Sequence, residues 1–381
     1  MSDLKSGEDI FGREDHVAPL SIIAMQSSKD LGDKINAHLV GWAKQSKHPQ
    51  ETYLVRSECP RFSSGDAKGI IHSSIRGDDV FILVDVGNYS CTYKMFGREN
   101  AMSPDDHYQD LKRIIQAISG KAHRINVIMP ILYGGRQHRR NYRESLDCAF
   151  ALQELRDMGV SNVLTFDAHD PRVQNAVPLM GFDNIIPSYQ VLKALFNNVP
   201  DIIPDQKHLM IVSPDEGAMS RNMYYASVLG VDLGMFYKRR DYSRIVNGRN
   251  PIVAHEYLGN SVEGKDVFIA DDIISSGESM LDIAYELKKR KARNIYAYAT
   301  YAIFTNGLAS FDKAYAEGAI AGVLGTNLTY STEALKNREW FYEVDVSKYI
   351  AYYIVALNHD MSVSVIIDPH KKIENLLKRF R

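Results

Sequence analysis

The second half of the chain carries the sequence Val267-Phe-Ile-Ala-Asp-Asp-Ile-Ile-Ser-Ser-Gly-Glu-Ser-Met280. Its first four residues are apolar and predict a short buried strand, which ends at two adjacent carboxylates, Asp271 and Asp272. Small, hydroxyl-bearing residues follow, and apolar residues at helical spacing over 280–287 predict a helix. A strand, a small-residue turn and a helix N-terminus form an anion site, because free backbone N–H groups converge there and the helix dipole adds positive potential.

The acidic pair and the turn together indicate a site for a phosphorylated sugar, since carboxylates beside an anion can hold sugar hydroxyls or Mg²⁺. The candidate sugar-phosphate-binding residues are Asp271, Asp272, Ser275, Ser276, Gly277 and Ser279. The same residues can instead form an Asx turn followed by a helix N-cap. Glu278 places a negative charge inside the turn, where a phosphate cradle is expected to have a small neutral residue.

Length and composition indicate a soluble globular protein of two or three domains. The chain has 381 residues, 45% hydrophobic and 24% charged, and a domain takes roughly 150 residues. The net charge of −2 gives no overall basic field, so nucleic acid is not an expected partner. The cysteines Cys59, Cys91 and Cys148 are widely spaced without a CxxC motif, which favours a reducing compartment over a zinc site or a disulfide framework.

The N-terminus and the apolar runs predict a cytoplasmic protein that does not enter a membrane. Residues 1–15 are polar and acidic, which is not the pattern of a signal peptide. No apolar run approaches the roughly 18 residues that a membrane-spanning helix needs.

Short apolar strands alternate with amphipathic helices, which predicts an α/β fold with mainly parallel sheets flanked by helices. The expected strands cover residues 20–25, 80–84, 125–129, 162–166, 208–212, 231–237, 267–270 and 294–300. The expected helices cover residues 29–44, 104–119, 145–158, 190–196, 219–229, 280–287 and 347–358. Residues 85–103 are expected to be irregular, and the chain ends in a basic amphipathic segment.

The two halves of the chain look alike, because residues 163–169 and 267–272 are both apolar strands that end in acids. This similarity predicts two similar domains, over residues 1–185 and 186–381. Ligands of open α/β sheets bind outside the carboxyl ends of the strands, so the polar residues at such ends are expected to share a site.

Five short motifs follow one another along the chain. They are Arg136-Gln137, Asp167-Ala-His169, Ser213-Pro-Asp215, Lys238-Arg-Arg240 and the acidic pair with Ser276-Gly277. In this order, and at strand ends, they resemble the motifs of ribose-phosphate pyrophosphokinases, also called phosphoribosyl pyrophosphate synthetases, from about residue 20 to about residue 365. The resemblance implies two phosphoribosyltransferase-like domains, with the ATP side in the N-terminal domain and the sugar-phosphate and catalytic loops in the C-terminal domain.

The resemblance also implies a reaction, its cofactors and its partners. ATP carried by Mg²⁺ donates its β,γ-diphosphoryl group to the anomeric hydroxyl of ribose 5-phosphate, which gives phosphoribosyl pyrophosphate and AMP. A homo-oligomer is implied, either a dimer or a hexamer built from dimers. Such a transfer needs charge neutralisation and in-line positioning more than covalent catalysis.

By resemblance, two cations are catalytic, Lys238 and Arg240. The loop over residues 239–249 is rich in flexible and basic residues and can close over ATP, although a solvated basic loop is the simpler alternative. The implied ATP-binding residues are Phe62, Asp66, Arg136, Gln137 and Arg143. Arginine suits a phosphate fork, and Gln137 can donate to adenine or phosphate; a charged surface turn is the alternative for this stretch.

The resemblance places Mg²⁺ on His169, with Asp215 as an oxygen ligand. Imidazole is an unusual ligand for Mg²⁺, so His169 can instead be a hydrogen-bonded residue of its turn. The segment Phe62-Ser-Ser-Gly-Asp66 resembles the family's adenine-binding loop, which serves a neighbouring subunit, and Phe62 can stack on adenine. The family usually has an acid at the position of Ser64, so purine selectivity can differ in this chain.

Two departures from the family pattern leave the acceptor open. The family usually has Asp-Thr-Gly-Gly-Thr where this chain has Ser275-Ser-Gly-Glu-Ser279, and an inward-pointing Glu278 would repel a phosphate dianion. Residues 87–103 also form a longer region than usual. Transfer to a modified ribose 5-phosphate such as ADP-ribose is therefore one alternative, and a non-catalytic regulatory homologue is another. A phosphoribosyltransferase would explain the acidic pair but neither Arg136-Gln137 nor the Lys238 loop.

Overall fold

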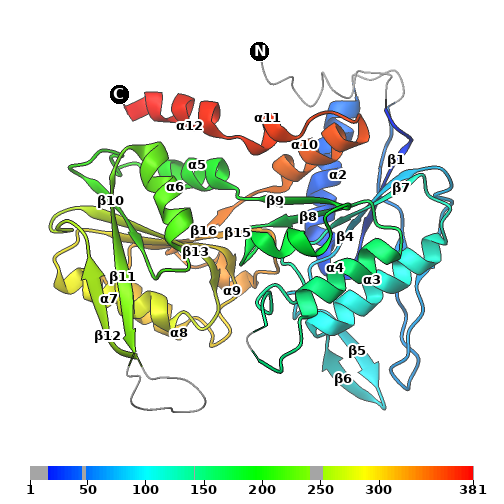
Figure 1. The fold of residues 1–381 in the computed structure, drawn as a ribbon, viewed down its shortest axis with the longest axis horizontal. Helices are drawn as coiled ribbons and strands as arrows, with labels where there is room; N and C mark the ends of the chain where they lie inside the picture. Colours follow the sequence, from blue (N-terminus) through cyan, green and yellow to red (C-terminus); the bar gives the residue numbers. More distant parts are fainter. Residues whose placement is uncertain (1–15, 45–48, 141, 241–251, 381) are drawn as a thin grey trace. The chain divides into compact units, whose positions relative to one another are not determined.

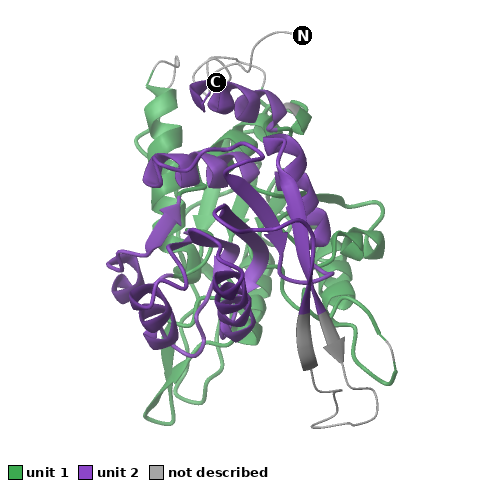
Figure 2. Ribbon diagram, turned by 90° about the vertical axis from the view of Figure 1, so that its left-hand side faces the viewer, with its two compact units in different colours: residues 1–187, 327–330, 345–368 green, residues 188–326, 331–344, 369–381 purple. Residues whose placement is uncertain are grey.

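A computed structural model of the chain describes residues 16–44, 49–140, 142–240 and 252–380, with side-chain positions for all of these except 238–240, 252–255, 365 and 367. The chain forms two compact units (Figure 2). Unit 1 comprises residues 1–187, 327–330 and 345–368, and unit 2 comprises residues 188–326, 331–344 and 369–381. Each unit is built on one main sheet with helices packed against it (Figure 1).

Unit 1 contains a parallel sheet in the strand order β1-β4-β7-β8-β9. Its strands are β1 (Leu20–Ala24), β4 (Asp79–Leu83), β7 (Arg124–Ile128), β8 (Asn162–Phe166) and β9 (Gly181–Ile185). Its helices are η1 (Gln26–Ser28), α2 (Lys29–Ala43), α3 (Pro104–Ile118), α4 (Asp147–Asp157), η2 (Pro171–Ala176), α10 (Ser347–Asn358) and α11 (Ser364–Ile367). Two small antiparallel pairs lie outside the sheet, β2 (Ser57–Glu58) with β3 (Ile70–Ile71), and β5 (Thr92–Met95) with β6 (Arg98–Ala101).

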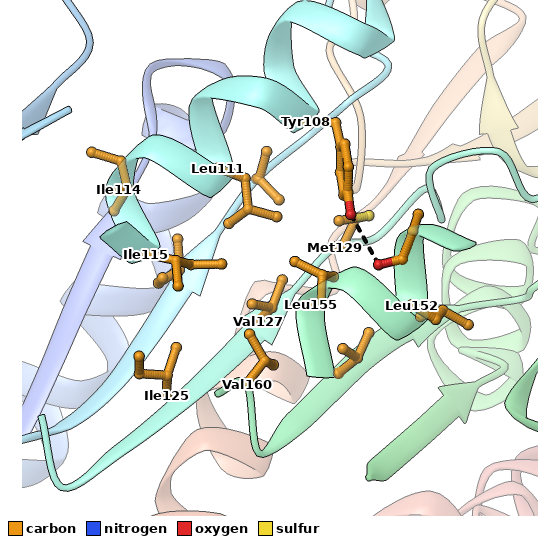
Figure 3. Packing of buried hydrophobic residues seen from close by; sticks show 14 of the residues in the cluster. Tyr108, Leu111, Ile114, Ile115, Ile125, Val127, Met129, Leu152, Leu155 and Val160 are labelled. Atoms are coloured by element: carbon orange, nitrogen blue, oxygen red, sulfur yellow. Dashed lines mark hydrogen bonds between the residues drawn. The ribbon is translucent and has the colours of Figure 1, made fainter. Parts of the chain in front are cut away.

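The core of unit 1 forms where α3 and α4 pack on the sheet (Figure 3). Helix α3 starts at a capping box in which the Ser103 hydroxyl and the Asp106 backbone N–H are 3.2 Å apart, and Pro104 occupies its first position. Its buried residues recur at steps of three and four, which turns one apolar face toward the strands. Each large apolar side chain buried in this way stabilises the fold by about 1.5–3 kcal/mol.

Unit 2 contains a sheet in the strand order β12-β11-β10-β13-β14-β15-β16, parallel except for the antiparallel pair β11 and β12. Its strands are β10 (Leu209–Ser213), β11 (Asp232–Arg240), β12 (Ile252–Leu258), β13 (Asp266–Ile274), β14 (Ile295–Ala302), β15 (Gly322–Thr326) and β16 (Phe341–Val344). Its helices are α5 (Ser188–Asn198), α6 (Met219–Leu229), α7 (Glu278–Lys289), α8 (Ala309–Ala316), α9 (Glu333–Lys336), α12 (His370–Leu377) and η3 (Lys378–Phe380).

The expected α/β fold with mainly parallel sheets is confirmed, but three local predictions are wrong. Residues 85–103 are not all irregular, because they contain the β5–β6 hairpin. Strand β13 does not end at the acidic pair but continues through it to Ile274, paired with β14. Strand β11 continues through Lys238 and Arg240 as half of an antiparallel ribbon with β12, so these residues lie on a strand and not on a loop.

The chain crosses from unit 1 to unit 2 between residues 187 and 188, and residues 345–368 pack with unit 1. The sequence predicted a single domain boundary at 185/186 and therefore assigned residues 345–368 to the C-terminal domain. A single boundary cannot describe a chain that comes back to its first unit after forming the second. The functional division into an ATP side and a sugar-phosphate side stays a prediction. Among the described residues, none of the helices has the length and apolar character needed to span a membrane.

Candidate functional site

The acidic pair of β13 lies where the strand loses one of its two neighbours. On one side β14 stays paired with it, with Asp271 opposite Ala299. On the other side, the pairing with β10 reaches only as far as Phe268. Because buried peptide groups need hydrogen-bond partners, the backbone at Ala270 requires a partner that is not a strand.

Asn222 of α6 is that partner. Its side-chain oxygen accepts from the Ala270 N–H at 3.0 Å, and its nitrogen donates to the Ala270 carbonyl at 2.7 Å. The Asn222 nitrogen also donates to the Ala218 carbonyl at 2.9 Å, and the residue is fully buried. Asn222 thus replaces a neighbouring peptide and fixes the strand immediately before Asp271. Sequence reasoning missed this residue, although an asparagine seven residues after Asp215, in the first turn of the expected helix 219–229, was a usable signal.

Arg221 brings positive charge to the acidic pair. Its Nη1 lies 3.7 Å from Oδ1 of Asp271, and Asp271 accepts a hydrogen bond from the Asp272 backbone N–H at 2.9 Å. Burial raises the pKa of Asp271, the neighbouring Asp272 carboxyl raises it further, and Arg221 acts in the opposite direction. The pair therefore retains a proton more readily than two isolated carboxyls, which reduces its repulsion of a phosphorylated ligand.

The turn after β13 requires a glycine at one position. Gly277 has a φ of +82°, and a Cβ there would overlap the buried ring of Phe311. Gly277 is also the N-cap residue of α7, and Ser276 Oγ lies 3.5 Å from the Glu278 nitrogen. Ser275, Ser276 and Ser279 therefore surround the N-terminus of a 12-residue helix, where N–H groups and the helix dipole favour an anion.

Glu278 is exposed on the first turn of α7 and lies close to a neighbouring turn. Its Oε1 is 3.4 Å from the side-chain nitrogen of Asn306, which follows β14. This weak contact gives the carboxylate a neutral partner outside the 275–277 turn. The turn can therefore keep its anion-binding N–H groups although the helix begins with an acid.

Asp215 follows β10 and lies at the same sheet edge as the acidic pair, because β10 and β13 are parallel neighbours. Its Oδ1 accepts from the Ala218 N–H at 3.1 Å, which caps the approach to α6. The Ser213 hydroxyl donates to the Asp215 carbonyl at 2.8 Å. Unit 2 thus places Asp215, the acidic pair and the serine-rich turn at the carboxyl ends of adjacent strands.

In unit 1, the end of β8 is held by β9. Asp167 is buried with a φ of +43°, a conformation that non-glycine residues seldom adopt. Its N–H donates to the Ile185 carbonyl at 2.8 Å, and the Ala168 N–H donates to Oδ1 of Asn184 at 2.9 Å. These bonds fix the turn that carries His169, which is exposed. Maintained backbone strain of this kind often marks a functional site.

His169 lies beside a second histidine. The ring centroids of His169 and His138 are 5.3 Å apart, and Nε2 of His138 is 3.5 Å from Oδ2 of Asp170. The hydrogen bonds from Arg172 hold the pKa of Asp170 well below its usual range. His138 Nδ1 is buried without a hydrogen-bond partner. His138 directly follows Gln137, so its contacts with His169 and Asp170 place the Arg136-Gln137 stretch next to the end of β8.

The predicted ATP-binding residues of this stretch have different environments. Gln137 donates from Nε2 to the carbonyls of Ser145 at 2.9 Å and Arg139 at 3.2 Å, so it bridges its own loop. Arg136 and Arg143 are exposed and can meet a phosphate without leaving a buried contact. The loop-bridging role of Gln137 was not predicted.

Phe62 and Asp66 belong to a separate tight loop of unit 1. The Phe62 N–H donates to the Asp66 carbonyl at 2.7 Å, and the Ser64 hydroxyl donates to Oδ2 of Asp66 at 2.8 Å. The Phe62 side chain is 55% exposed, as a stacking residue must be before a base binds. Lys238 and Arg240 lie on β11, and residues 241–249 of the predicted catalytic loop lie outside the described residues.

Comparison with known proteins places this arrangement in a family. Residues 20–159 match the N-terminal domain of ribose phosphate pyrophosphokinase, and residues 185–312 match the phosphoribosyl transferase domain. A ribose-phosphate pyrophosphokinase from Vibrio parahaemolyticus is 30% identical over 255 residues, covering 65% of this chain and 72% of that protein. The chain belongs to the ribose-phosphate pyrophosphokinase family. Another such pyrophosphokinase, from Neisseria meningitidis, is 25% identical over 352 residues, covering 92% of this chain and 95% of that protein.

The fold of this ribose-phosphate pyrophosphokinase family member is that of a solved relative. The crystal structure of phosphoribosylpyrophosphate synthetase from Mycobacterium smegmatis matches with a TM-score of 0.72 and 20% identity, covering 90% of this chain and 99% of that one. The resemblance seen in the motifs is thereby confirmed for the family and the fold. The roles of the individual site residues stay predictions.

Proposed function

We propose that the chain transfers the diphosphoryl group of ATP to the anomeric hydroxyl of ribose 5-phosphate, giving phosphoribosyl pyrophosphate and AMP. Family membership supports this reaction. The structural observation that carries it is the acidic pair of β13, which Asn222 holds in place beside a glycine-dependent turn at the N-terminus of α7. This arrangement suits a ligand that has vicinal hydroxyls at one end and a phosphate at the other.

In this proposal, residues of unit 2 bind the acceptor substrate, ribose 5-phosphate. Asp271 and Asp272 accept hydrogen bonds from ribose hydroxyls, and charged acceptors make such bonds strong. The backbone of the turn and the hydroxyls of Ser275, Ser276 and Ser279 bind the 5-phosphate. The predicted catalytic cations, Lys238 and Arg240, would neutralise the charge that develops as the diphosphoryl group moves.

In the same proposal, residues of unit 1 bind ATP. Arg136 and Arg143 would hold phosphate oxygens, Gln137 would donate to adenine or phosphate, and Phe62 would stack on the base. Asp66 is fixed by Ser64 and offers its second oxygen to a donor of the purine. A homo-oligomer, dimer or hexamer, is proposed from the family resemblance, and the free thiols of all three cysteines support a reducing, cytoplasmic location.

Mg²⁺ is proposed as the ion that accompanies ATP, with His169 and Asp215 as its protein ligands. The donor chemistry fits in part, since Asp215 offers a carboxylate oxygen whereas imidazole is an unusual ligand for this ion. Among the described residues, no group of three or more acidic, histidine or cysteine side chains forms a metal cage. This suits Mg²⁺, which usually keeps water and substrate phosphates as ligands. When bound, the ion would neutralise phosphate charge.

The products of ATP and ribose 5-phosphate test this proposal directly. Chromatography of a reaction with Mg²⁺ is expected to show AMP and phosphoribosyl pyrophosphate in equal amounts. ADP in place of AMP would indicate transfer of a single phosphoryl group and would contradict the proposal. The absence of AMP with every phosphorylated pentose would favour the non-catalytic homologue.

A second candidate acceptor is a modified ribose 5-phosphate such as ADP-ribose. The exposed Glu278 favours it, because a phosphodiester carries less charge than a terminal phosphate dianion near a carboxylate. Mass spectrometry of the products from each acceptor decides the question. Glu278→Thr is expected to increase kcat/KM for ribose 5-phosphate more than for ADP-ribose. If neither the wild type nor Glu278→Thr forms a product from ADP-ribose, ADP-ribose is excluded as an acceptor.

A further inference from the structure

The β5–β6 hairpin, in the region that the sequence predicted to be longer than usual for the family, contacts the Phe62–Asp66 loop at its tip. The hairpin pairs Tyr93 with Asn100 and Met95 with Arg98, and it turns at Phe96 and Gly97 (Figure 1). The Phe96 N–H donates to the Ser63 carbonyl at 2.8 Å. One backbone hydrogen bond therefore joins the hairpin tip to the centre of the loop.

The second contact is a close approach at Gly65. This residue has a φ of +99°, and a Cβ built on it would lie 2.7 Å from Sδ of Met95. The loop therefore passes so near Met95 that no larger side chain fits without displacement. The Gly65 N–H in turn donates to the Phe62 carbonyl at 2.9 Å, so the contact at Gly65 is relayed to Phe62.

The third contact lies at the base of the loop. The guanidinium carbon of Arg61 lies 5.0 Å from the ring centroid of Tyr93, a cation–π distance. The same guanidinium makes two hydrogen bonds to Asp110 of α3, at 2.8 and 2.9 Å, and both side chains are buried. The hairpin thus contacts Arg61, Ser63 and Gly65, the residues that flank Phe62 and Ser64.

We propose that the β5–β6 hairpin is a positioning element that holds the Phe62–Asp66 loop ready to receive the base of ATP. This inference rests on the proposed function of the loop. The side chains of Tyr93 and Met95 share one face of β5 and lie half-buried, whereas Lys94 on the other face is exposed, as strand alternation requires. A loop fixed in this way binds its ligand more tightly, because less conformational freedom is lost on binding.

A shortened hairpin tests the proposal. Residues 94–99 are replaced by Asn-Gly, which closes a two-residue hairpin between Tyr93 and Asn100 and removes Met95 and Phe96. Since base–aromatic stacking sets the expected scale, KM for ATP should rise about 10-fold, with kcat and KM for the phosphorylated pentose unchanged. Met95→Ala should raise KM for ATP by a smaller factor, and Lys94→Ala is the matched control that should not.

Equilibrium binding of ATP to the full-length protein distinguishes a failure of the proposed function from a failure of the proposed role of the hairpin. Weak or absent binding by the wild type would contradict the proposed function, whereas equal binding by wild type and shortened variant would overturn only the hairpin's role. Size-exclusion chromatography and thermal unfolding show whether the assembly and fold are kept. If the shortened variant does not fold, Met95→Ala against Lys94→Ala decides, and identical KM values for ATP in these two variants refute the proposal.

Discussion

Carboxylates lie directly after β8 and near the carboxyl end of β13, but the backbone at the two positions is supported in different ways. After β8, the Asp167 N–H donates to the backbone carbonyl of Ile185 in β9, and the Ala168 N–H donates to the side chain of Asn184 in the same strand. At Ala270, just before the acidic pair of β13, the pairing with β10 has already ended at Phe268, and a side chain from α6 supplies both hydrogen bonds. At β8, one of the two bonds joins backbone groups and does not depend on a particular side chain, whereas at β13 both bonds depend on a single amide side chain.

The largest effect is expected at the carboxylates of β13 themselves. Asp271→Ala or Asp272→Ala should reduce kcat/KM for ribose 5-phosphate by about 100-fold, since a hydrogen bond to a charged group contributes about 1.5–3 kcal/mol. Steady-state kinetics check this against Asp282→Ala, which removes an exposed acid of α7 and should leave kcat/KM unchanged. A loss of less than 3-fold in both site variants would remove the acidic pair from the acceptor site.

Asn222→Leu is the sharpest test of the difference between the strand ends. It leaves the N–H and carbonyl of Ala270 buried without partners, which should lower the free energy of unfolding by about 3 kcal/mol. Because Asp271 then loses its support, KM for ribose 5-phosphate should rise about 10-fold while KM for ATP stays unchanged. Urea unfolding and kinetics measure the two quantities.

The matched control for this variant is Asn198→Leu. Asn198 is an exposed asparagine of α5 whose side chain donates to the Ala194 carbonyl at 2.8 Å within its own helix. The Asn198→Leu substitution should change the free energy of unfolding by less than about 1 kcal/mol. If Asn222→Leu lost stability but kept its KM for ribose 5-phosphate, Asn222 would be a purely structural residue.

The fold and the acceptor segment could be read from the sequence because their signals are local. Expected strands of four to seven residues, a glycine in a serine-rich turn and the helical spacing of α7 are all signals that depend on near neighbours in the sequence. The bounds of β8, α6 and α10 agree with the predicted ranges. The carboxylates of Asp271 and Asp272 are adjacent in sequence, so their proximity required no knowledge of the fold.

The supporting contacts could not be read because they join distant segments. Asn222 is 48 residues from Ala270, and its amide resembles any other polar residue of a helix. The β5–β6 hairpin lacks strong strand-forming residues at Arg98 and Asn100, which explains why this region was expected to be irregular. Strand β13 was predicted too short, because its second half contains acids and is paired on one side by β14.

A smaller effect is expected at the end of β8. Asn184→Ala removes one acceptor, that of the Ala168 N–H, and leaves the backbone bond from Asp167 to Ile185 intact. The loss of stability should be about 1 kcal/mol, and KM for ATP should change by less than about 3-fold. Asn175→Ala, at an exposed position of η2, is the control. An effect as large as that of Asn222→Leu would remove the distinction between the two strand ends.

The stability contributions of Asp271 in β13 and Asp170 after β8 should depend on pH in opposite directions. The pKa of Asp271 is raised by burial, so its contribution to stability is complete below about pH 4 and is lost as the pH rises through the raised value. The pKa of Asp170 is lowered by hydrogen bonds from Arg172, so its contribution is present above about pH 4 and is lost as the pH falls.

Urea unfolding between pH 3 and pH 9 separates these contributions. Asp271→Asn should flatten the decline of stability on the alkaline side, and Asp170→Asn should flatten the decline on the acid side. The acid-side effect should be the smaller one, because Arg172 is largely exposed and solvent screens its pair with Asp170. If both variants changed the same limb of the profile, the two strand ends would share one electrostatic environment, contrary to the separate partners that Arg221 and Arg172 provide.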